Sequence, residues 1–570
     1  MDRRGTALTS AGRSARWPRL LPYGWLAFGG ALTFLAIFFA YPLVEILRRS
    51  LFDGWSPDLG AFSEVLGDDY FRGRIFFSFW LALVSTVATV ALGLPSAYVF
   101  AHYSFPGKTL LRSVSTVPFV MPAIVVAFGF IALFGPDGLV NDGLRWLLGR
   151  DDAALDMIGT FEVIVLAHVF YNYTIVMRVV SGFWASLDPR LAEASHVLGA
   201  GRWQTLRHVT VPLVAPAVAA AALLVFIFSF TSFGVVLILG SRDHATLEVE
   251  IYRQTAQIFD LRVAGALAMI QVVVTFGFML LYTRLQERSA ARIDFRQQLR
   301  ERAPGSVLAR CAVVLNALAV LLVVLSPLLA LVHSALRVDG HYSTAAFENL
   351  FSGESATLRL VAPETAIRNS LAFAGLTVLL AVPLGTAIAY RLAAQARYSF
   401  VLDAVLMLPL AVSAVTLGFG FLIALDEPPL DLRASWLLLV IAHSLIAYPF
   451  VVRSLLSVLR GINPRLREAA AVLGAGRLRT FTEVDLPIIW RALVVGAVFA
   501  FAVSLGEFGA TLLLARPEYT TMPVAIFRAL GQPGPRALSE ALAMASLLML
   551  VAGAGFILIE RLRYRGSSGF

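Results

Sequence analysis

The sequence predicts an all-α integral membrane protein with about twelve transmembrane helices in two fused halves. Three observations support this fold class. The 570 residues are 58% hydrophobic and only 15% charged, which is far more apolar than a soluble domain. Apolar runs of about 20 residues, the length that crosses roughly 30 Å of hydrocarbon, recur along the chain. Finally, segments of the first half return in the second half at a constant spacing.

The apolar runs define the expected spans. In the first half we expect six spans, near residues 25–47, 76–101, 112–134, 160–182, 214–239 and 263–285. In the second half we expect six more, near 309–333, 369–392, 400–425, 435–456, 490–515 and 539–560. The domain boundaries follow as an N-terminal tail (1–24), a first half (25–285), a linker (286–308), a second half (309–560) and a C-terminal tail (561–570).

The charge pattern sets the orientation and narrows the class of protein. The net charge is +9, but the arginines cluster in short segments between apolar runs, as in cytoplasmic loops of membrane proteins. We therefore expect both termini and the linker in the cytoplasm, and no nucleic-acid partner. The N-terminal arginines precede an apolar run without a small-residue cleavage pattern, which favours a retained first span. The single cysteine, Cys311, argues against disulfide or thiolate-metal chemistry.

The repeat links three separate segments. EASHVLGAGRWQTLRHVTVPL, beginning at Glu193, returns 275 positions later as EAAAVLGAGRLRTFTEVDLPI, beginning at Glu468. The motifs at 167–178 and 229–239 return at the same spacing. Earlier segments return 292 positions later, a change that we attribute to a longer outer loop after the third span. Because each half has an even number of spans, the halves form a parallel repeat with both polar loops on one face.

Each polar loop is predicted to fold as a short helix, a glycine bend, a second helix and a proline that leads back into the membrane. Asp188 or Asn463 would cap the first helix, followed by a proline at its first position. Gly199 or Gly201, and Gly474 or Gly476, would supply the left-handed residue that ends it. Apolar and charged side chains lie next to each other on this helix, as on a surface that docks in a partner's groove. The alternative is a capped interfacial helix that merely closes a turn.

These loops resemble the signature of integral-membrane subunits of bacterial ATP-binding-cassette importers. The second copy carries the full pattern, and in the first copy Ser195 replaces the second alanine. The resemblance implies that each short helix is a coupling helix that docks on a separate ATPase subunit. The positions implied in coupling are Glu193, Ala194, Gly199, Pro212, Glu468, Ala469, Gly474 and Pro487.

The resemblance also implies two partners and places nucleotide on another chain. A cytoplasmic ATPase homodimer would bind ATP and magnesium, and a substrate-binding protein outside the membrane would deliver the cargo. The sequence agrees, because the Lys108 segment lacks the first glycine of a phosphate-binding loop: that position is His102. No catalytic, cofactor or metal motif is found, so we expect a non-catalytic subunit in the bacterial inner membrane.

Four residues are candidates for the pathway: Glu507, Ser232, His168 and His443. A carboxylate inside a span costs roughly 2.5–3.5 kcal/mol on insertion scales and usually faces a cavity or a partner. Glu507 either contacts a cationic cargo or gate, or pairs with His443 near a broken helix, and we favour the structural role. Its counterpart in the first half is Ser232. The two histidines occupy equivalent positions and are expected to hydrogen-bond between helices, with transport as the alternative.

The cargo follows from resemblance alone. Residues 70–285 resemble fused permeases of thiamine importers, and the second half does so more weakly, which implies thiamine or a phosphorylated form as cargo. Fused ferric-iron permeases share the plan and are the alternative. A secondary carrier that works without an ATPase is the alternative from a different class.

Overall fold

The computed structural model describes residues 22–149, 155–290, 301–338, 340–351, 362–394, 399–426, 428, 430–532 and 534–564. Most of the predicted terminal tails and the middle of the predicted linker lie outside these residues. Eleven helices in the described part are long and apolar enough to cross a membrane. The chain is therefore a multi-pass, all-α membrane protein, as predicted.

The first half runs from α1 to α15. Its elements are α1 (Pro22–Leu35), η1 (Ala36–Ala40), α2 (Tyr41–Leu51), β1 (Phe52–Asp53), β2 (Ser56–Pro57), α3 (Gly60–Gly67), α4 (Asp69–His102), α5 (Lys108–Val114), α6 (Val117–Val120), α7 (Ala123–Phe134), α8 (Leu139–Leu148), α9 (Phe161–Ala185), α10 (Pro189–Val197), α11 (Arg202–Thr205), η2 (Leu206–Thr210), α12 (Val211–Phe230), α13 (Gly234–Leu239), α14 (Leu247–Arg253), η3 (Gln254–Ile258) and α15 (Leu261–Ala290).

The second half repeats this order. Its elements are α16 (Val307–Ala335), β3 (Arg337–Val338), β4 (His341–Tyr342), α17 (Ala345–Phe351), α18 (Pro363–Ala394), α19 (Ser399–Leu406), η4 (Leu408–Leu410), α20 (Ala414–Ala424), α21 (Leu437–Gly461), α22 (Pro464–Val472), α23 (Arg477–Thr480), η5 (Phe481–Asp485), α24 (Leu486–Leu505), α25 (Gly509–Leu514), η6 (Pro517–Tyr519), α26 (Met522–Leu530) and α27 (Pro535–Tyr564).

The centre of each half is a packed group of three long helices. In the first half α4, α9 and α12 contact one another, and in the second half α18, α21 and α24 do the same. β1 and β2 form a short antiparallel hairpin, and β3 and β4 form its counterpart. The loop after α7 contains the extra helix α8, which accounts for the predicted change in repeat spacing.

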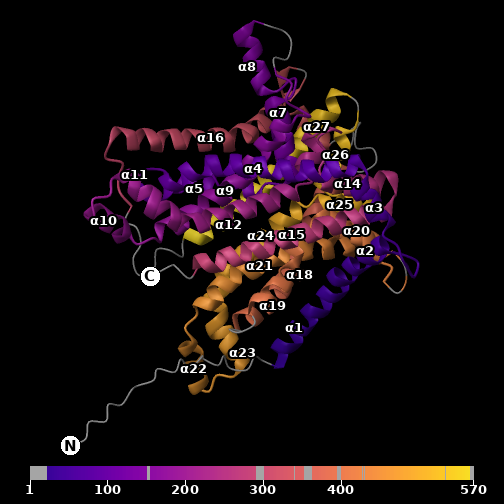
Figure 1. Cartoon of the computed structure of the whole chain (residues 1–570). Helices are drawn as coiled ribbons and strands as arrows, with labels where there is room; N and C mark the ends of the chain where they lie inside the picture. Colours follow the sequence, from indigo (N-terminus) through magenta and orange to yellow (C-terminus); the bar gives the residue numbers. More distant parts are fainter. Residues whose placement is uncertain are drawn as a thin grey trace, which may run out of the picture.

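The first helix of each half packs against the other half. Phe28, Ala31 and Leu35 of α1 belong to the hydrophobic core of the second half. Conversely, Val320 and Val324 of α16 pack in a cluster of first-half residues. Figure 1 shows α1 beside α18, while α16 extends along the side of the first half. The halves therefore exchange their first helices.

Close backbone contacts fix these exchanged helices. A Cβ atom on Gly129 of α7 would lie 2.8 Å from the carbonyl oxygen of Pro327 in α16. At the equivalent contact, a Cβ atom on Gly420 of α20 would lie 3.1 Å from Cβ of Pro42 in α2. Small residues allow helix backbones to approach closely inside a membrane, where packing drives association. The two glycines thus seat each exchanged helix on the opposite half.

Several predicted spans are interrupted. The predicted ninth span, 400–425, is built from α19, a short 3₁₀ turn and α20, of which only α20 is among the shorter apolar helices. The predicted spans 214–239 and 490–515 break after α12 and α24, and their last turns form the separate helices α13 and α25. A run of apolar residues predicts that a segment lies in the membrane. It does not predict that the segment is one continuous helix, because some residues at the breaks are apolar too.

Pro212 and Pro487 lead from the loops into the membrane helices, as predicted, and they do so without ending a helix. The second loop helix and the following span are continuous helices, Arg202–Phe230 and Leu478–Leu505. Pro212 and Pro487 lie at the start of α12 and α24, each directly after a π-helical turn. A proline lacks the N–H group and clashes with the carbonyl four residues earlier, so a widened turn accommodates it without ending the helix.

Replacing Gly129 with alanine is expected to lower the stability of the purified chain by about 1–3 kcal/mol, because the added methyl group meets backbone of α16. The measurement is the midpoint of thermal unfolding in detergent, followed by size-exclusion chromatography. Gly277→Ala is the matched control, since a Cβ atom there has no neighbour within 4 Å. Equal midpoints for the two variants would contradict the packing role.

Candidate functional site

The two polar loops fold alike. Helices α10 and α22 each begin with a proline, and the side chains of Asp188 and Asn463 accept hydrogen bonds from the backbone N–H groups of Arg190 and Arg465, at 2.9 and 3.1 Å. Each helix ends next to a glycine in the left-handed region, Gly199 with φ +85° and Gly474 with φ +79°. The glycines two positions later do not have this conformation. The predicted caps and bends are therefore confirmed.

The ends of these short helices expose apolar side chains. Leu198 is 87% exposed and its counterpart Leu473 is 86% exposed, and the valines before them are each 87% exposed. Glu193, Ala194, Glu468 and Ala469 are also exposed. Within the described part of the chain, the carboxylates of Glu193 and Glu468 have no ion-pair partner. Two copies of one amphipathic surface are thus available to another protein.

The loops are attached to the helices by different interactions. In the second loop, Arg467 donates to Asp485 over 2.8 Å, and both side chains are buried. In the first loop the Ser195 and Thr205 hydroxyls are 2.8 Å apart, which ties α10 to α11. Ser195 is the position that departs from the repeat motif. Its hydrogen bond to Thr205 supports the first loop, where the ion pair of Arg467 and Asp485 supports the second. The exposed surfaces stay alike although their supports differ.

Both loops lie at one end of the long helices. Figure 1 shows α10 and α22 on the left and lower left, whereas α3, α14 and α26 lie at the opposite end of the molecule. This arrangement confirms the parallel repeat, since equivalent elements of the two halves lie at the same end.

Glu507 lies in the break between α24 and α25 and is 6% exposed. Its carboxylate accepts the backbone N–H groups of Ala510 at 2.8 Å and Thr511 at 2.9 Å, and also the Thr511 hydroxyl. Nε2 of His443 lies 3.3 Å from Oε2 of Glu507, while Nδ1 of the same ring is 2.8 Å from the Ser504 hydroxyl. The carboxylate therefore caps α25 and joins it to α21, as the structural alternative predicted.

The equivalent group in the first half is incomplete. Nδ1 of His168 is 2.9 Å from the Ser85 hydroxyl, which links α9 to α4 as predicted for an interhelical contact. Nε2 of His168 is buried and has no hydrogen-bond partner among the described residues. The positions that bond the corresponding nitrogen of His443 are occupied here by Ser232 and Val236. The pseudo-twofold symmetry is thus broken at this ring.

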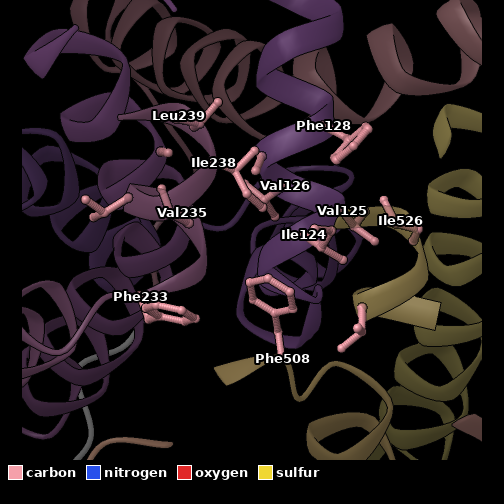
Figure 2. Packing of buried hydrophobic residues seen from close by; sticks show 14 of the residues in the cluster. Ile124, Val125, Val126, Phe128, Phe233, Val235, Ile238, Leu239, Phe508 and Ile526 are labelled. Carbon is pink, nitrogen blue, oxygen red and sulfur yellow. The ribbon is translucent and has the colours of Figure 1, made fainter. Parts of the chain in front are cut away.

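An aromatic pair closes the interface between the halves. Phe233 and Phe508 follow the two helix breaks at equivalent positions, and their rings stack with centroids 5.7 Å apart. Tyr252 packs on Phe233 and Phe527 packs on Phe508, again at equivalent positions. Figure 2 shows Phe508 beneath Ile124, with Phe233 to one side. These residues belong to one hydrophobic core shared by both halves.

A cavity of about 330 Å³ lies beside this pair. His168 and Ser232 line it, whereas Glu507 and His443 do not. The other lining residues come from both halves: Phe119, Val120, Met121, Pro122, Ala123, Tyr171, Asn172, Phe228, Phe233, Gly234, Val235, Phe450, Phe499, Ala502, Val503 and Gly506. Most of them come from the far ends of α12 and α24, next to the two helix breaks, and from the middle of α9 and α21. The cavity therefore lies between the halves, beside the helix breaks.

The sequence analysis missed several of these residues. Tyr171 and Asn172 lie in a segment that was recognised only as a repeat, although their counterparts are Ile446 and Ala447. A comparison of where the two copies differ, rather than where they agree, is the signal that points to them. Phe450 and Phe499 carry no such signal, because isolated phenylalanines in apolar spans are ordinary.

The described residues contain no group of three or more His, Cys, Asp or Glu side chains placed to hold a metal ion. The polar side chains of the interior serve helix breaks and interhelical contacts instead. The chemistry that the geometry supports is passage of a solute between the two halves.

Two homologous membrane halves, a cavity between them and a pair of exposed loops on one face define a membrane transport protein. Residues 89–295 and 381–564 each match the family described as binding-protein-dependent transport system inner membrane component. Because these two matches cover most of the chain, the protein belongs to this family.

Relatives of full length are also found. The thiamine transport system permease protein ThiP of Escherichia coli K12 is 26% identical, over 95% of this chain and 97% of its own. A probable ABC transporter permease protein, y4fN of Sinorhizobium fredii, is 27% identical over 96% of each chain. A crystal structure of a bacterial alginate ABC transporter with its periplasmic protein covers 48% of this chain and 97% of its own, at 18% identity and a TM-score of 0.40.

Replacing Glu507 with alanine is expected to lower stability by about 1–3 kcal/mol, because it leaves two buried backbone N–H groups without their partner. Thermal unfolding of the purified chain is the measurement. Ser232→Ala at the equivalent position is the control and should leave the midpoint nearly unchanged. If Glu507→Ala were as stable as this control, the capping role would be refuted.

Proposed function

We propose that this chain is the translocation subunit of an ATP-driven importer that moves thiamine, or a phosphorylated form of it, into the bacterial cytoplasm. The observation that carries this proposal is the pair of matching exposed loops, α10 and α22, on one face of two homologous halves. Membership in the binding-protein-dependent transport family supports the transport class, and the names of the full-length relatives support the cargo.

The partner on the loop face is a homodimeric ATPase. Two copies of one helix, each with an exposed carboxylate and exposed aliphatic side chains, suit two identical clefts related by a twofold axis. In this assembly ATP and magnesium bind to the partner, and the chain itself holds no cofactor and catalyses no reaction. The resemblance to importer subunits supplies the kind of partner, and the equal exposure of the two loops supports the symmetry.

The loop face is the cytoplasmic face. Arginines in and next to both loops, in the terminal segments and in the linker favour this side of the membrane. Both termini then lie in the cytoplasm of a bacterial cell, and the chain lies in its inner membrane. The opposite end, with α3, α14, α17 and α26, faces outward and receives the substrate-binding protein.

Transport proceeds by alternating access between the halves. Closure of the ATPase dimer on ATP brings α10 and α22 together and opens the outward side toward the binding protein. Hydrolysis lets the loops separate and opens the cavity toward the cytoplasm. A helix that is continuous from loop to membrane, as in Arg202–Phe230, transmits such a movement to the membrane interior.

Two alternatives are tested by the same assay. A ferric-iron importer would have the same architecture with another cargo, and a secondary carrier would move its solute without an ATPase. The assay is cargo-stimulated ATP hydrolysis and uptake in proteoliposomes that contain this chain with its ATPase and binding protein. Thiamine is expected to stimulate both, and ferric iron is not. Stimulation by ferric iron alone, or uptake without the ATPase, would overturn the proposal.

Reversing both loop carboxylates, Glu193→Arg with Glu468→Arg, is expected to reduce cargo-stimulated hydrolysis to the unstimulated rate, because the loops then present the wrong charge to the ATPase. Co-purification of the ATPase with the variant is the second readout. Glu64→Arg is the control for co-purification of the ATPase, since this exposed glutamate on α3 lies at the end of the molecule opposite the loops. Normal coupling in the double variant would refute the docking role of the loops.

A further inference from the structure

Six of the side chains that line the cavity between the halves are aromatic: Phe119, Tyr171, Phe228, Phe233, Phe450 and Phe499. None of its lining residues in the described part of the chain is Asp, Glu, Lys or Arg. Aromatic faces attract organic cations and stack on flat rings. The cavity therefore differs from a site for an anion or for a bare metal ion.

One wall of the cavity offers hydrogen bonds. Nε2 of His168 is buried without a partner among the described residues, and whether it donates or accepts depends on the tautomer set by the contact between Nδ1 and Ser85. Asn172 donates to the Ser229 hydroxyl over 3.3 Å, which leaves its amide oxygen to accept. An unpartnered polar atom in a buried position costs free energy unless a ligand or water satisfies it. The two residues are four positions apart and lie on the same face of α9.

We propose that this cavity is a binding site for cargo within the membrane, built for a flat nitrogen heterocycle that carries a positive charge. The rings hold the charged, aromatic body of the ligand, and His168 with Asn172 reads the nitrogen atoms at its edge. The proposal rests on the proposed function, because thiamine combines a cationic thiazolium ring with an aminopyrimidine that both donates and accepts. It adds that the permease itself, and not the binding protein alone, selects the cargo.

The second half does not offer an equivalent site. There the ring of His443 is bonded on both sides, by Ser504 and by Thr511, next to the carboxylate of Glu507. Ile446 and Ala447 replace Tyr171 and Asn172, which removes the polar edge. The cargo is therefore held in one orientation, with its hydrogen-bonding edge against the first half and ring contacts from Phe450 and Phe499 of the second.

One double variant and one single variant test the site in the reconstituted importer. Phe228→Leu with Phe499→Leu keeps apolar volume but removes two ring faces, and His168→Leu removes the hydrogen-bonding edge. Each is expected to raise the apparent Kd for radiolabelled thiamine, measured on the permease and ATPase complex in nanodiscs without binding protein, by about tenfold. Phe278→Leu is the control, because this half-buried ring packs on Phe226 and does not line the cavity.

The ring variants should also lose the preference for charge. Thiochrome, a neutral oxidation product of thiamine, is expected to bind the wild-type complex at least tenfold more weakly than thiamine, and the double ring variant should narrow this gap. Unstimulated ATP hydrolysis and the elution volume show whether each variant remains folded. Unchanged thiamine affinity in folded ring and His168 variants, or equal losses in Phe278→Leu, would overturn the site.

A different outcome would separate this proposal from the cargo assignment. If the wild-type complex does not transport thiamine but binds benzyltrimethylammonium in a manner that depends on Phe228 and Phe499, the cargo assignment fails and the site for an aromatic cation stands. If thiamine is transported and all cavity variants retain wild-type affinity, the site fails and the cargo assignment stands.

Discussion

A helix that stops inside a bilayer leaves backbone groups without partners, and this constraint shapes the interior of the protein. Such breaks are tolerated only where other protein groups or a cavity meet the freed groups. Here both breaks, after α12 and after α24, lie at the contact between the halves. Glu507 satisfies two of the freed amides at one break and binds His443. The stacked phenylalanines, the cavity and the shared core are all arranged around these two points.

The protein combines a symmetric face with an asymmetric interior. The exposed loops keep the same caps, bends and side-chain exposure in both halves, even where Arg467 and Ser195 support them by different contacts. Around the cavity, by contrast, equivalent positions hold different chemistry, as with Ser232 and Glu507 or Asn172 and Ala447. A partner with twofold symmetry requires two equal loops. A small solute without twofold symmetry is bound better by a cavity whose two walls differ. Duplication followed by divergence supplies both within one chain.

Much of this architecture could be predicted from the sequence, because it depends on local signals. Hydrophobic length predicted the long helices, the repeat predicted the parallel halves, and Asp188, Asn463, Gly199 and Gly474 predicted the loop ends. The failures have a common cause. Breaks such as the one that divides 400–425 depend on contacts between distant segments, as between the Tyr448 hydroxyl and the carbonyl of Leu406. The aromatic lining was missed for the same reason, since a phenylalanine in a span has no pattern that separates packing from binding.

The exchange of the first helices changes what the covalent linker does. Because α1 is packed into the core of the second half and α16 lies against the first, the two halves are interlocked by exchanged helices. The covalent linker is then not needed to hold the two halves together. It ensures instead that each first half is paired with one second half. Two different polypeptides with the same exchange of helices would form the same assembly. Two copies of one polypeptide would not, because the two walls of the cavity would then be identical. Fusion of the two halves therefore guarantees that every assembled transporter contains one copy of each wall.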